Sequence, residues 1–131
     1  MIVDASALLA IVLGKPKSYA RAIAADPRPR MPSVTWFEAS MRIEWAGDSI
    51  AASRFEEVPK IFGIDIIPFT LRHAEVARDR RRLYGRPTHS AGLNFGDCLV
   101  DGVAKSESER LLFKGTDFAQ TDIVAALPTQ A

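Results

Sequence analysis

Short apolar runs separated by helix-forming stretches are the feature that most constrains this fold. Residues 2–3 form the first run, and it passes through Asp4 into a helix-forming segment over residues 5–13. Residues 64–69 and 111–113 are further strand-like runs, with a weaker one at residues 123–124. Strands that alternate with helices usually pair in parallel through right-handed crossovers. The pattern therefore predicts an α/β fold built on a short parallel sheet of four or five strands.

Helix boundaries follow from capping residues and from glycine and proline. We expect helices over residues 5–13 and 17–25, a third that follows a cap at Ser33 or Thr35 and reaches residues 45–46, and further ones over residues 49–61, 71–83 and 95–105. The N-cap candidates are Ser33 or Thr35, Asp48, Thr70 and Asn94, and Gly47 ends the third helix. Residues 26–32 contain three prolines and are expected to form a connector with room for a short extended segment.

Length and composition restrict the classes of protein that this chain can be. Its 131 residues fit one domain, residues 1–131, and 17 basic against 16 acidic side chains leave a net charge of only +1. A broad field that attracts nucleic acid or membrane is therefore excluded. The single cysteine, Cys98, excludes an internal disulfide and a cysteine zinc site, and is interpreted as a small buried residue. No run is long enough to span a membrane and no basic region precedes an apolar one, so we expect a cytoplasmic protein.

Four acidic residues stand at junctions expected at one edge of the sheet. They are Asp4, Glu38, Asp97 and Asp117. Each has a structural explanation when taken singly. Asp4 can cap the helix that follows, Glu38 can complete a capping box with Thr35, Asp97 can complement a helix dipole, and Asp117 can open a capped turn.

Taken together, the four carboxylates indicate a cation site. Carboxylates gathered in one crevice repel each other, and a bound cation removes that cost. Oxygen ligands without histidine or cysteine suit Mg²⁺ or Mn²⁺ better than zinc. Such ions support phosphodiester hydrolysis, because they activate water and stabilise the leaving oxygen.

Three further residues are accessory candidates. Asp101 follows Asp97 by four positions, so the two share a helical face, although a solvent-facing role for Asp101 is the favoured interpretation. Ser6 and Thr116 flank Asp4 and Asp117. Their hydroxyls can orient a carboxylate or a water molecule, or can simply bond to the local backbone.

The ordered set of motifs resembles one known family. Residues 1–8, 38–40, 93–98 and 111–118 are similar to the PIN-domain ribonucleases, and within them to the VapC toxins of bacterial VapBC toxin–antitoxin modules. The resemblance implies a three-layer α/β/α fold and an endoribonuclease that depends on Mg²⁺ or Mn²⁺ and acts as a toxin. Asp4 and Asp97 would be the principal metal ligands, with Glu38 and Asp117 completing the cluster. It also implies a VapB-like antitoxin that inserts a segment near the site, and a toxin homodimer.

Two positions depart from the family pattern. Thr116 stands where many relatives have Asp or Asn, and Asp101 stands where an aromatic or small residue is common. One interpretation is that Asp101 compensates for Thr116.

A basic segment is the main candidate for RNA contact. Five arginines crowd the end of one expected helix and the loop after it: Arg78, Arg80, Arg81, Arg82 and Arg86. Dipole complementation at a helix C-terminus explains two or three of them. We select Arg82, Arg86 and Lys114 as RNA-binding candidates, because they can meet a phosphate backbone or an unpaired base.

Two alternatives use the same residues. A phosphoacceptor receiver domain also gathers acids at strand ends, but it needs an acceptor Asp at the end of a central strand. Asp65 instead begins its run. A degenerate PIN-like module that binds a partner without catalysis is the other alternative, and the four intact acids argue against it.

Overall fold

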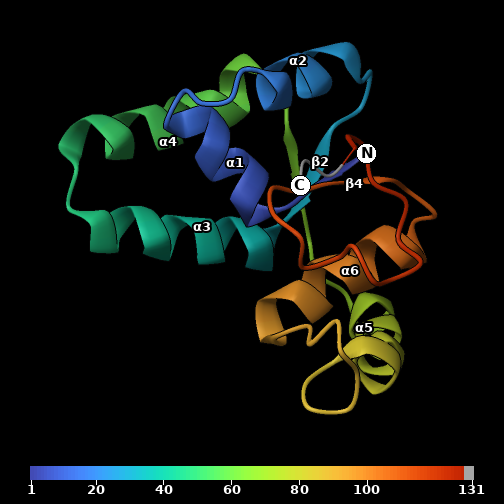
Figure 1. Cartoon of the computed structure of the whole chain (residues 1–131). Helices are drawn as coiled ribbons and strands as arrows, with labels where there is room; N and C mark the ends of the chain where they lie inside the picture. Colours follow the sequence, from blue (N-terminus) through green and yellow to red (C-terminus); the bar gives the residue numbers. More distant parts are fainter. Residues whose placement is uncertain (129–131) are drawn as a thin grey trace.

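A four-stranded parallel sheet forms the centre of the computed structural model, which describes residues 1–128 (Figure 1). The strands are β1 (Ile2–Val3), β2 (Arg30–Pro32), β3 (Asp65–Ile67) and β4 (Leu111–Leu112), in the order β3-β2-β1-β4. Ile2 lies opposite both Arg30 and Leu111, which fixes the register of the central pairs. The expected parallel α/β sheet is confirmed. The weak run at residues 123–124 is not a strand, and only a single bridge joins Leu111 to Ala125.

Helices cover both faces of this sheet. The helices are α1 (Ala5–Val12), α2 (Ser18–Ala25), α3 (Ser33–Ala46), α4 (Ser49–Ile61), α5 (Leu71–Tyr84) and α6 (Phe95–Ser106). Figure 1 shows α1 to α4 gathered on one side of the sheet and α5 with α6 on the other. The three-layer arrangement expected from the resemblance is therefore confirmed.

Alternation of side chains along the short strands divides the apolar core into two clusters. Val3 and Leu112 are buried with α1, α3 and α4, whereas Ile2 and Leu111 are buried with α6. Successive side chains of a strand point to opposite faces, so strands of two residues still serve both layers. All four side chains are completely buried.

Most of the expected helix ends are confirmed. Asp48, Thr70 and Asn94 each accept a hydrogen bond from a backbone N–H in the first turn of the helix that they cap. Gly47 ends α3 in the left-handed conformation, at φ 67°. Local side-chain chemistry sets these ends, and it is visible in the sequence.

The start of α3 differs from the prediction. Strand β2 runs directly into the helix, so Pro32 occupies the N-cap position and no side chain caps it. The hydroxyl of Thr35 is buried and finds no hydrogen-bond partner in the described part of the chain. The proposed capping box of Thr35 and Glu38 is therefore wrong, and Glu38 loses its structural explanation.

The proline-rich connector holds an inner strand of the sheet. β2 lies between β1 and β3, with Met31 completely buried. Pro29 lacks an N–H but its carbonyl accepts from the N–H of Asp65, 3.0 Å away. The prolines remove donors only, so the neighbouring strands still hold this segment in the sheet.

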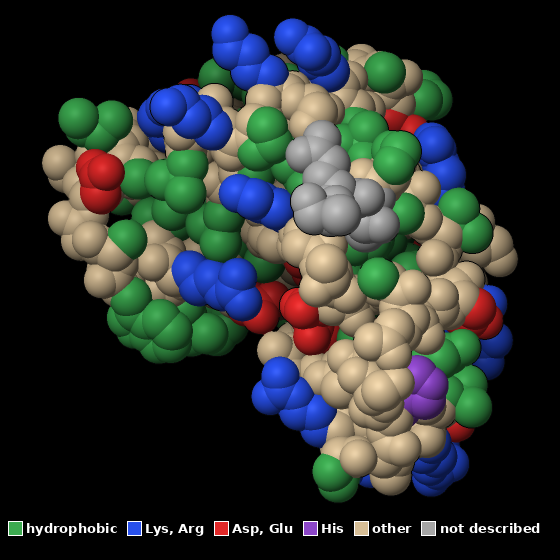
Figure 2. Space-filling view, viewed as in Figure 1, with side chains coloured by type: hydrophobic (Ala, Val, Ile, Leu, Met, Phe, Trp, Pro, Cys, Tyr) green, Lys and Arg blue, Asp and Glu red, His purple; other side chains and the backbone are tan. Residues whose placement is uncertain are grey.

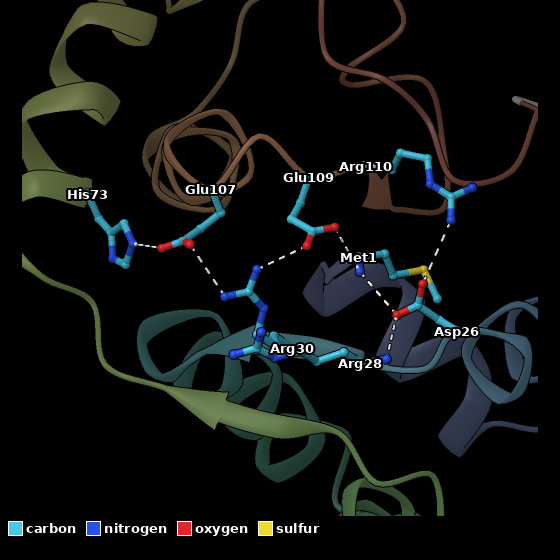
Figure 3. A network of polar contacts seen from close by, with 8 residues as sticks. All are labelled: Met1, Asp26, Arg28, Arg30, His73, Glu107, Glu109 and Arg110. Carbon is cyan, nitrogen blue, oxygen red and sulfur yellow. Dashed lines mark hydrogen bonds and ion pairs between the residues drawn. The ribbon is translucent and has the colours of Figure 1, made fainter.

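Ion pairs join the layers at the amino ends of the strands (Figure 3). Arg30 contacts Glu107 and Glu109 at 3.4 and 3.1 Å, and Nε2 of His73 lies 2.9 Å from Glu107. The amino group of Met1 contacts Asp26 and Glu109, each at 3.1 Å. Each carboxylate drawn at this edge therefore has a cationic or histidine partner.

Helices α5 and α6 pack very closely. A Cβ placed on Gly102 would lie 2.7 Å from the Cα of Ala77, so only glycine permits this approach. Arg80 of α5 and Asp101 of α6 form a buried pair across the contact, with 2.6 Å between Nε and Oδ2.

Within residues 1–128, every helix is too short or too polar to cross a membrane.

Candidate active site

Asp4 begins the site at the carboxyl end of β1. Its N–H donates to the carbonyl of Leu112, 2.9 Å away, so the sheet itself holds the backbone. Its Oδ2 accepts from both the N–H and the hydroxyl of Ser6. Only 7% of Asp4 is exposed, and burial raises the pKa of this carboxyl despite the bonds from Ser6. The result is a buried carboxylate with a fixed orientation.

Asp97 enters the site from the first turn of α6. Its N–H donates to Oδ1 of Asn94, and its own Oδ2 accepts from the N–H of Asn94 at 3.2 Å. Burial, followed by the charges of Asp117, Asp4 and Glu38, raises the pKa of Asp97 to about 7. Asp97 therefore has a structural role, because it closes a capping box, and it also lies among the like charges of the candidate site.

Glu38 reaches the site from α3. Burial and the charge of Asp4 raise its pKa, and Arg42, 3.5 Å away on the next turn, acts in the opposite direction. The backbone of Gly96 lies directly against this carboxylate. A Cβ on Gly96 would clash with Oε2 of Glu38.

Asp117 lies on the exposed segment that follows β4, and its charge is among those that raise the pKa of Asp97. Ser6 ties this segment to β1, because its Oγ accepts from the N–H of Lys114 at 2.9 Å. One hydroxyl therefore links the ends of two adjacent strands and orients Asp4 between them.

The four acids act on each other through their charges. Asp4, Glu38 and Asp117 all raise the pKa of Asp97, whereas Arg42 is the cation that lowers the pKa values of Asp4 and Glu38. Figure 2 shows acidic side chains in the hollow between the two halves of the molecule, with Lys and Arg side chains near its rim. The carboxyl edge of the sheet therefore carries acids in excess of cations, unlike the amino edge of Figure 3.

This donor set fits a hard divalent cation. Each of the four side chains offers carboxylate oxygen, the ligand that Mg²⁺ and Mn²⁺ prefer. Within residues 1–128, no three side chains of His, Cys, Asp or Glu converge closely enough to hold a metal by themselves. Mg²⁺ is commonly held by one or two carboxylates, with water and substrate phosphate completing its shell. The arrangement fits that open type of site and does not fit a closed protein cage.

Comparison with known proteins identifies the family. The PIN domain model matches residues 1–124. The chain belongs to the PIN-domain family. Ribonuclease VapC30 of Mycobacterium tuberculosis is 34% identical over 131 residues, covering 98% of this chain and all of the relative. Ribonuclease VapC28 of the same organism is 35% identical over 130 residues, covering 97% of this chain and 98% of the relative.

Solved structures agree on the PIN fold. VapC20 of M. tuberculosis, described as a toxin that cleaves the sarcin–ricin loop, superposes with a TM-score of 0.74 at 17% identity, covering 97% of this chain and 98% of that one. A toxin–antitoxin complex from Klebsiella pneumoniae gives a TM-score of 0.70 at 18% identity, with 96% and 97% covered. The VapC expectation drawn from the motifs is confirmed.

The favoured interpretation that Asp101 faces solvent is wrong, and the structure gives no support to an accessory role for it in this PIN domain. Its side chain is completely buried, and both of its oxygens accept from Arg80. Helical periodicity places Asp97 and Asp101 on the same face of the helix, but it does not show that α5 covers Asp101. Asp101 is a structural partner of Arg80 and does not compensate for Thr116.

The two other accessory candidates, Ser6 and Thr116, differ in their contacts. Ser6 holds Asp4, as its position suggested. Thr116 is exposed, and its carbonyl accepts from the N–H of Ala119 at 3.1 Å, which is a turn contact. The structure gives the Thr116 side chain no hydrogen bond in the described residues, so it supports no role for this hydroxyl.

The candidates for RNA contact also divide. Arg82 is exposed and lies 3.7 Å from Asp79 on its own helix. Nε of Arg86 donates to the carbonyl of Gly92, at the mouth of a hollow beside Asn94. Lys114 is exposed next to the link between Ser6 and β4. Arg86 and Lys114 thus keep positions suited to a ligand, whereas Arg82 faces an acid elsewhere.

Two site residues escaped the sequence analysis. Arg42 is one helical turn after Glu38, and that i,i+4 spacing was the available signal. Gly96 fits against the Glu38 carboxylate, and no local pattern shows this, because α3 and α6 meet only in the folded chain.

Gly96→Ala should separate activity from stability. The three atoms nearest to the added methyl group all belong to the flexible end of Glu38, and alanine favours the helix by up to about 1 kcal/mol. We expect unchanged or higher thermal stability, together with RNA cleavage lowered about 10-fold because the Glu38 carboxylate is displaced. Cleavage assays on Gly96→Ala and Glu38→Gln side by side test this. Full activity in Gly96→Ala would show that the position of Glu38 is unimportant.

Thr35→Val should stabilise the protein. Valine keeps the branched shape of threonine but removes a buried hydroxyl that has no partner in the described residues. An unpaired buried polar group costs about 1–3 kcal/mol, so we expect a gain of about 1 kcal/mol in the free energy of unfolding. Urea denaturation measures this gain, and a loss of stability would mean that the hydroxyl is hydrogen-bonded in solution.

Proposed function

We propose that this PIN-domain protein is a metal-dependent endoribonuclease that acts as the toxin of a VapBC-type toxin–antitoxin module, with residues 1–131 forming one domain. The observation that carries the proposal is the group of four mutually repelling acids at the carboxyl edge of the sheet. VapC ribonucleases that match along nearly the whole chain support it. A substrate of cellular RNA would place the activity in the cytoplasm.

Asp4 and Asp97 would hold the metal. Ser6 fixes one oxygen of Asp4, and Asn94 fixes one oxygen of Asp97, so each residue presents its other oxygen in a defined direction. A bound Mg²⁺ or Mn²⁺ would supply positive charge beside the scissile phosphate and would acidify a water molecule. Burial among like charges raises the pKa of Asp97 to about 7, and a bound cation would remove the cost of ionising this carboxyl.

The remaining residues would handle protons and phosphate charge. Glu38 or Asp117 would accept a proton from the attacking water, and burial raises the pKa of Glu38 toward the range where a general base is effective. Arg42 beside Glu38 and Lys114 after β4 offer positive charge to the phosphate oxygens.

The partners of this activity would be an antitoxin and a second copy of the chain. The structural neighbour from Klebsiella pneumoniae is a toxin–antitoxin complex, which supports a VapB-like partner. Phe37 and Trp45 of α3 are large apolar side chains exposed at 57% and 80%, which supports burial of this helix in a homodimer.

Cleavage of RNA by the purified protein tests the proposal. We expect total RNA to be cut with Mg²⁺ or Mn²⁺ present, and to stay intact in excess chelator or with Asp4→Asn. Cleavage that survives both changes would exclude this mechanism. Calorimetry with Mn²⁺ separates the degenerate alternative, since a non-catalytic binding module with no metal site should take up no stoichiometric ion.

A further inference from the structure

A hollow of about 570 Å³ is lined by residues of α5, of α6 and of the loop that joins them, including Asn94, the N-cap of the helix that carries Asp97. Its floor is apolar and is made by Ala74, Ala77, Leu93, Cys98 and Leu99. Three arginines also line it, namely Arg78, Arg81 and Arg86. A cavity with this lining suits a ligand in which a flat apolar group is attached to a negatively charged one.

The three arginines carry charge that the protein leaves uncompensated. All three are exposed, and none forms a salt bridge within residues 1–128. Among the residues that the structure describes, no acidic side chain lines the hollow. Arg80 on the same helix differs, because Asp101 and Asp122 both pair with it. The hollow therefore favours an anion.

Two backbone contacts organise the mouth of the hollow. Nε of Arg86 donates to the carbonyl of Gly92 at 2.8 Å, and Nη2 of Arg81 donates to the carbonyl of Arg86 at 3.2 Å. Both guanidinium groups are thus held in place while retaining further N–H donors. An arginine that is already oriented loses less entropy when it binds phosphate.

Asn94 links the hollow to the proposed catalytic site. Asn94 and Phe95 line the hollow, and the backbone N–H of Asn94 donates to the carboxylate of Asp97. Phe95 is 81% exposed, which leaves its ring available for stacking. An unpaired base can stack on such a ring while a neighbouring phosphate reaches Asp97 through the metal site.

We propose that this hollow binds an unpaired nucleotide of the RNA substrate next to the scissile phosphate. The base packs on the apolar floor and against Phe95, and Arg78, Arg81 and Arg86 contact the flanking phosphates. The inference rests on the proposed function, because it names a specificity site for that same reaction. The alternative occupant, a segment of a protein partner, is an outcome of the test.

Equilibrium binding in the absence of metal tests whether the arginines of the hollow contact RNA phosphates. Chelator prevents cleavage, so the affinity of the full-length protein for a fluorescein-labelled single-stranded RNA can be followed by anisotropy at several salt concentrations. Arg78→Gln combined with Arg81→Gln should weaken binding at least 10-fold. The slope of log affinity against log salt should fall by about 1.4, since each phosphate contact on a single strand contributes about 0.7.

Arg82→Gln is the matched control. Arg82 follows Arg81 on α5 and is equally basic, but it does not line the hollow and faces Asp79. We expect unchanged RNA affinity and salt slope for this variant. An equal loss for Arg82→Gln and for the double variant would mean that the helix attracts RNA through general charge, and the proposed site would be rejected.

Filling the hollow with a larger side chain tests whether an RNA base binds there. Ala74→Phe places a ring on the floor without changing charge, so it should weaken RNA binding several-fold and leave the salt slope intact. Where cleavage is observed, it should also change the nucleotide preference beside the cut. If RNA affinity is unchanged in both the double arginine variant and Ala74→Phe, while binding of the antitoxin is lost, the hollow belongs to a protein partner. Binding is measured in chelator, so its result is separate from that of the cleavage assay. RNA that binds at the hollow but is never cut with Mg²⁺ or Mn²⁺ would defeat the proposed function and would leave only the RNA-binding part of this inference standing.

Discussion

Asp97→Asn will make the metal-free protein more stable above neutral pH while removing most of its RNA cleavage. Burial and the charges of Asp117, Asp4 and Glu38 raise the pKa of Asp97 from 3.8 to about 7. The folded state therefore holds this proton more tightly than the unfolded chain does. Asparagine keeps the shape of the protonated side chain and its capacity to accept from Asn94, but it carries no charge.

The sign of the pH dependence follows from that raised pKa. The stabilising effect of the proton is fully present below about pH 4 and is lost as the pH rises to about 7. The wild-type protein should thus lose stability across this range, and Asp97→Asn should not. Asp97 is partly exposed to solvent, which screens the effect, so we expect a gain of about 1–2 kcal/mol at pH 8 and almost none at pH 4.

Urea denaturation at both pH values, with chelator present, measures this gain. Added Mg²⁺ should reduce the stability gain of Asp97→Asn over the wild-type protein, because the ion binds and stabilises the wild-type protein and not the variant that lacks a metal ligand. Cleavage should fall more than about 100-fold, since a metal ligand matters more than the outer contacts that cost 10–100-fold. Asp79→Asn, at an exposed acid on α5, is the control and should change neither property. A less stable Asp97→Asn protein at pH 8 would contradict the crowding of acids at this site.

Asp101→Asn will destabilise the protein by about 3 kcal/mol without changing the activity of the molecules that remain folded. Asp101 is fully buried and Arg80 is 3% exposed, with 2.6 Å between Oδ2 and Nε. Removing one partner of a buried pair leaves the other charge uncompensated, at a cost of about 3–5 kcal/mol. Asp122 also pairs with Arg80, so we place the cost at the lower end.

Thermal and urea denaturation measure this loss, which is large beside a typical total stability of about 5–15 kcal/mol. Asp79→Asn again serves as the control, because it breaks an exposed pair with Arg82 that contributes less than about 1 kcal/mol. Should Asp101→Asn instead keep its stability and lose cleavage, Asp101 would be a member of the metal site after all.

The sequence analysis succeeded where local chemistry decides the structure. Asp48, Thr70 and Asn94 cap their helices as expected, because a capping side chain bonds to an N–H only two or three residues away. It failed at Thr35, and it did not show that the extended segment expected in the proline-rich connector is an inner strand of the sheet. There, strand pairing with β1 and β3 placed β2 directly before α3, and no local signal predicts such long-range pairing.

The same division applies to the site. The sequence by itself determined the alternating α/β order and the position of Asp4, Glu38, Asp97 and Asp117 at the junctions, because strands, caps and acids are local features. Only the tertiary structure decided that Asp101 neutralises Arg80, that Gly96 lies against Glu38, and that three unpaired arginines surround a hollow beside Asp97. The arginines form no salt bridge within residues 1–128, and the hollow that they line lies between α5 and α6. These features depend on how α3, α5 and α6 pack, and packing brings together side chains that are distant in the chain.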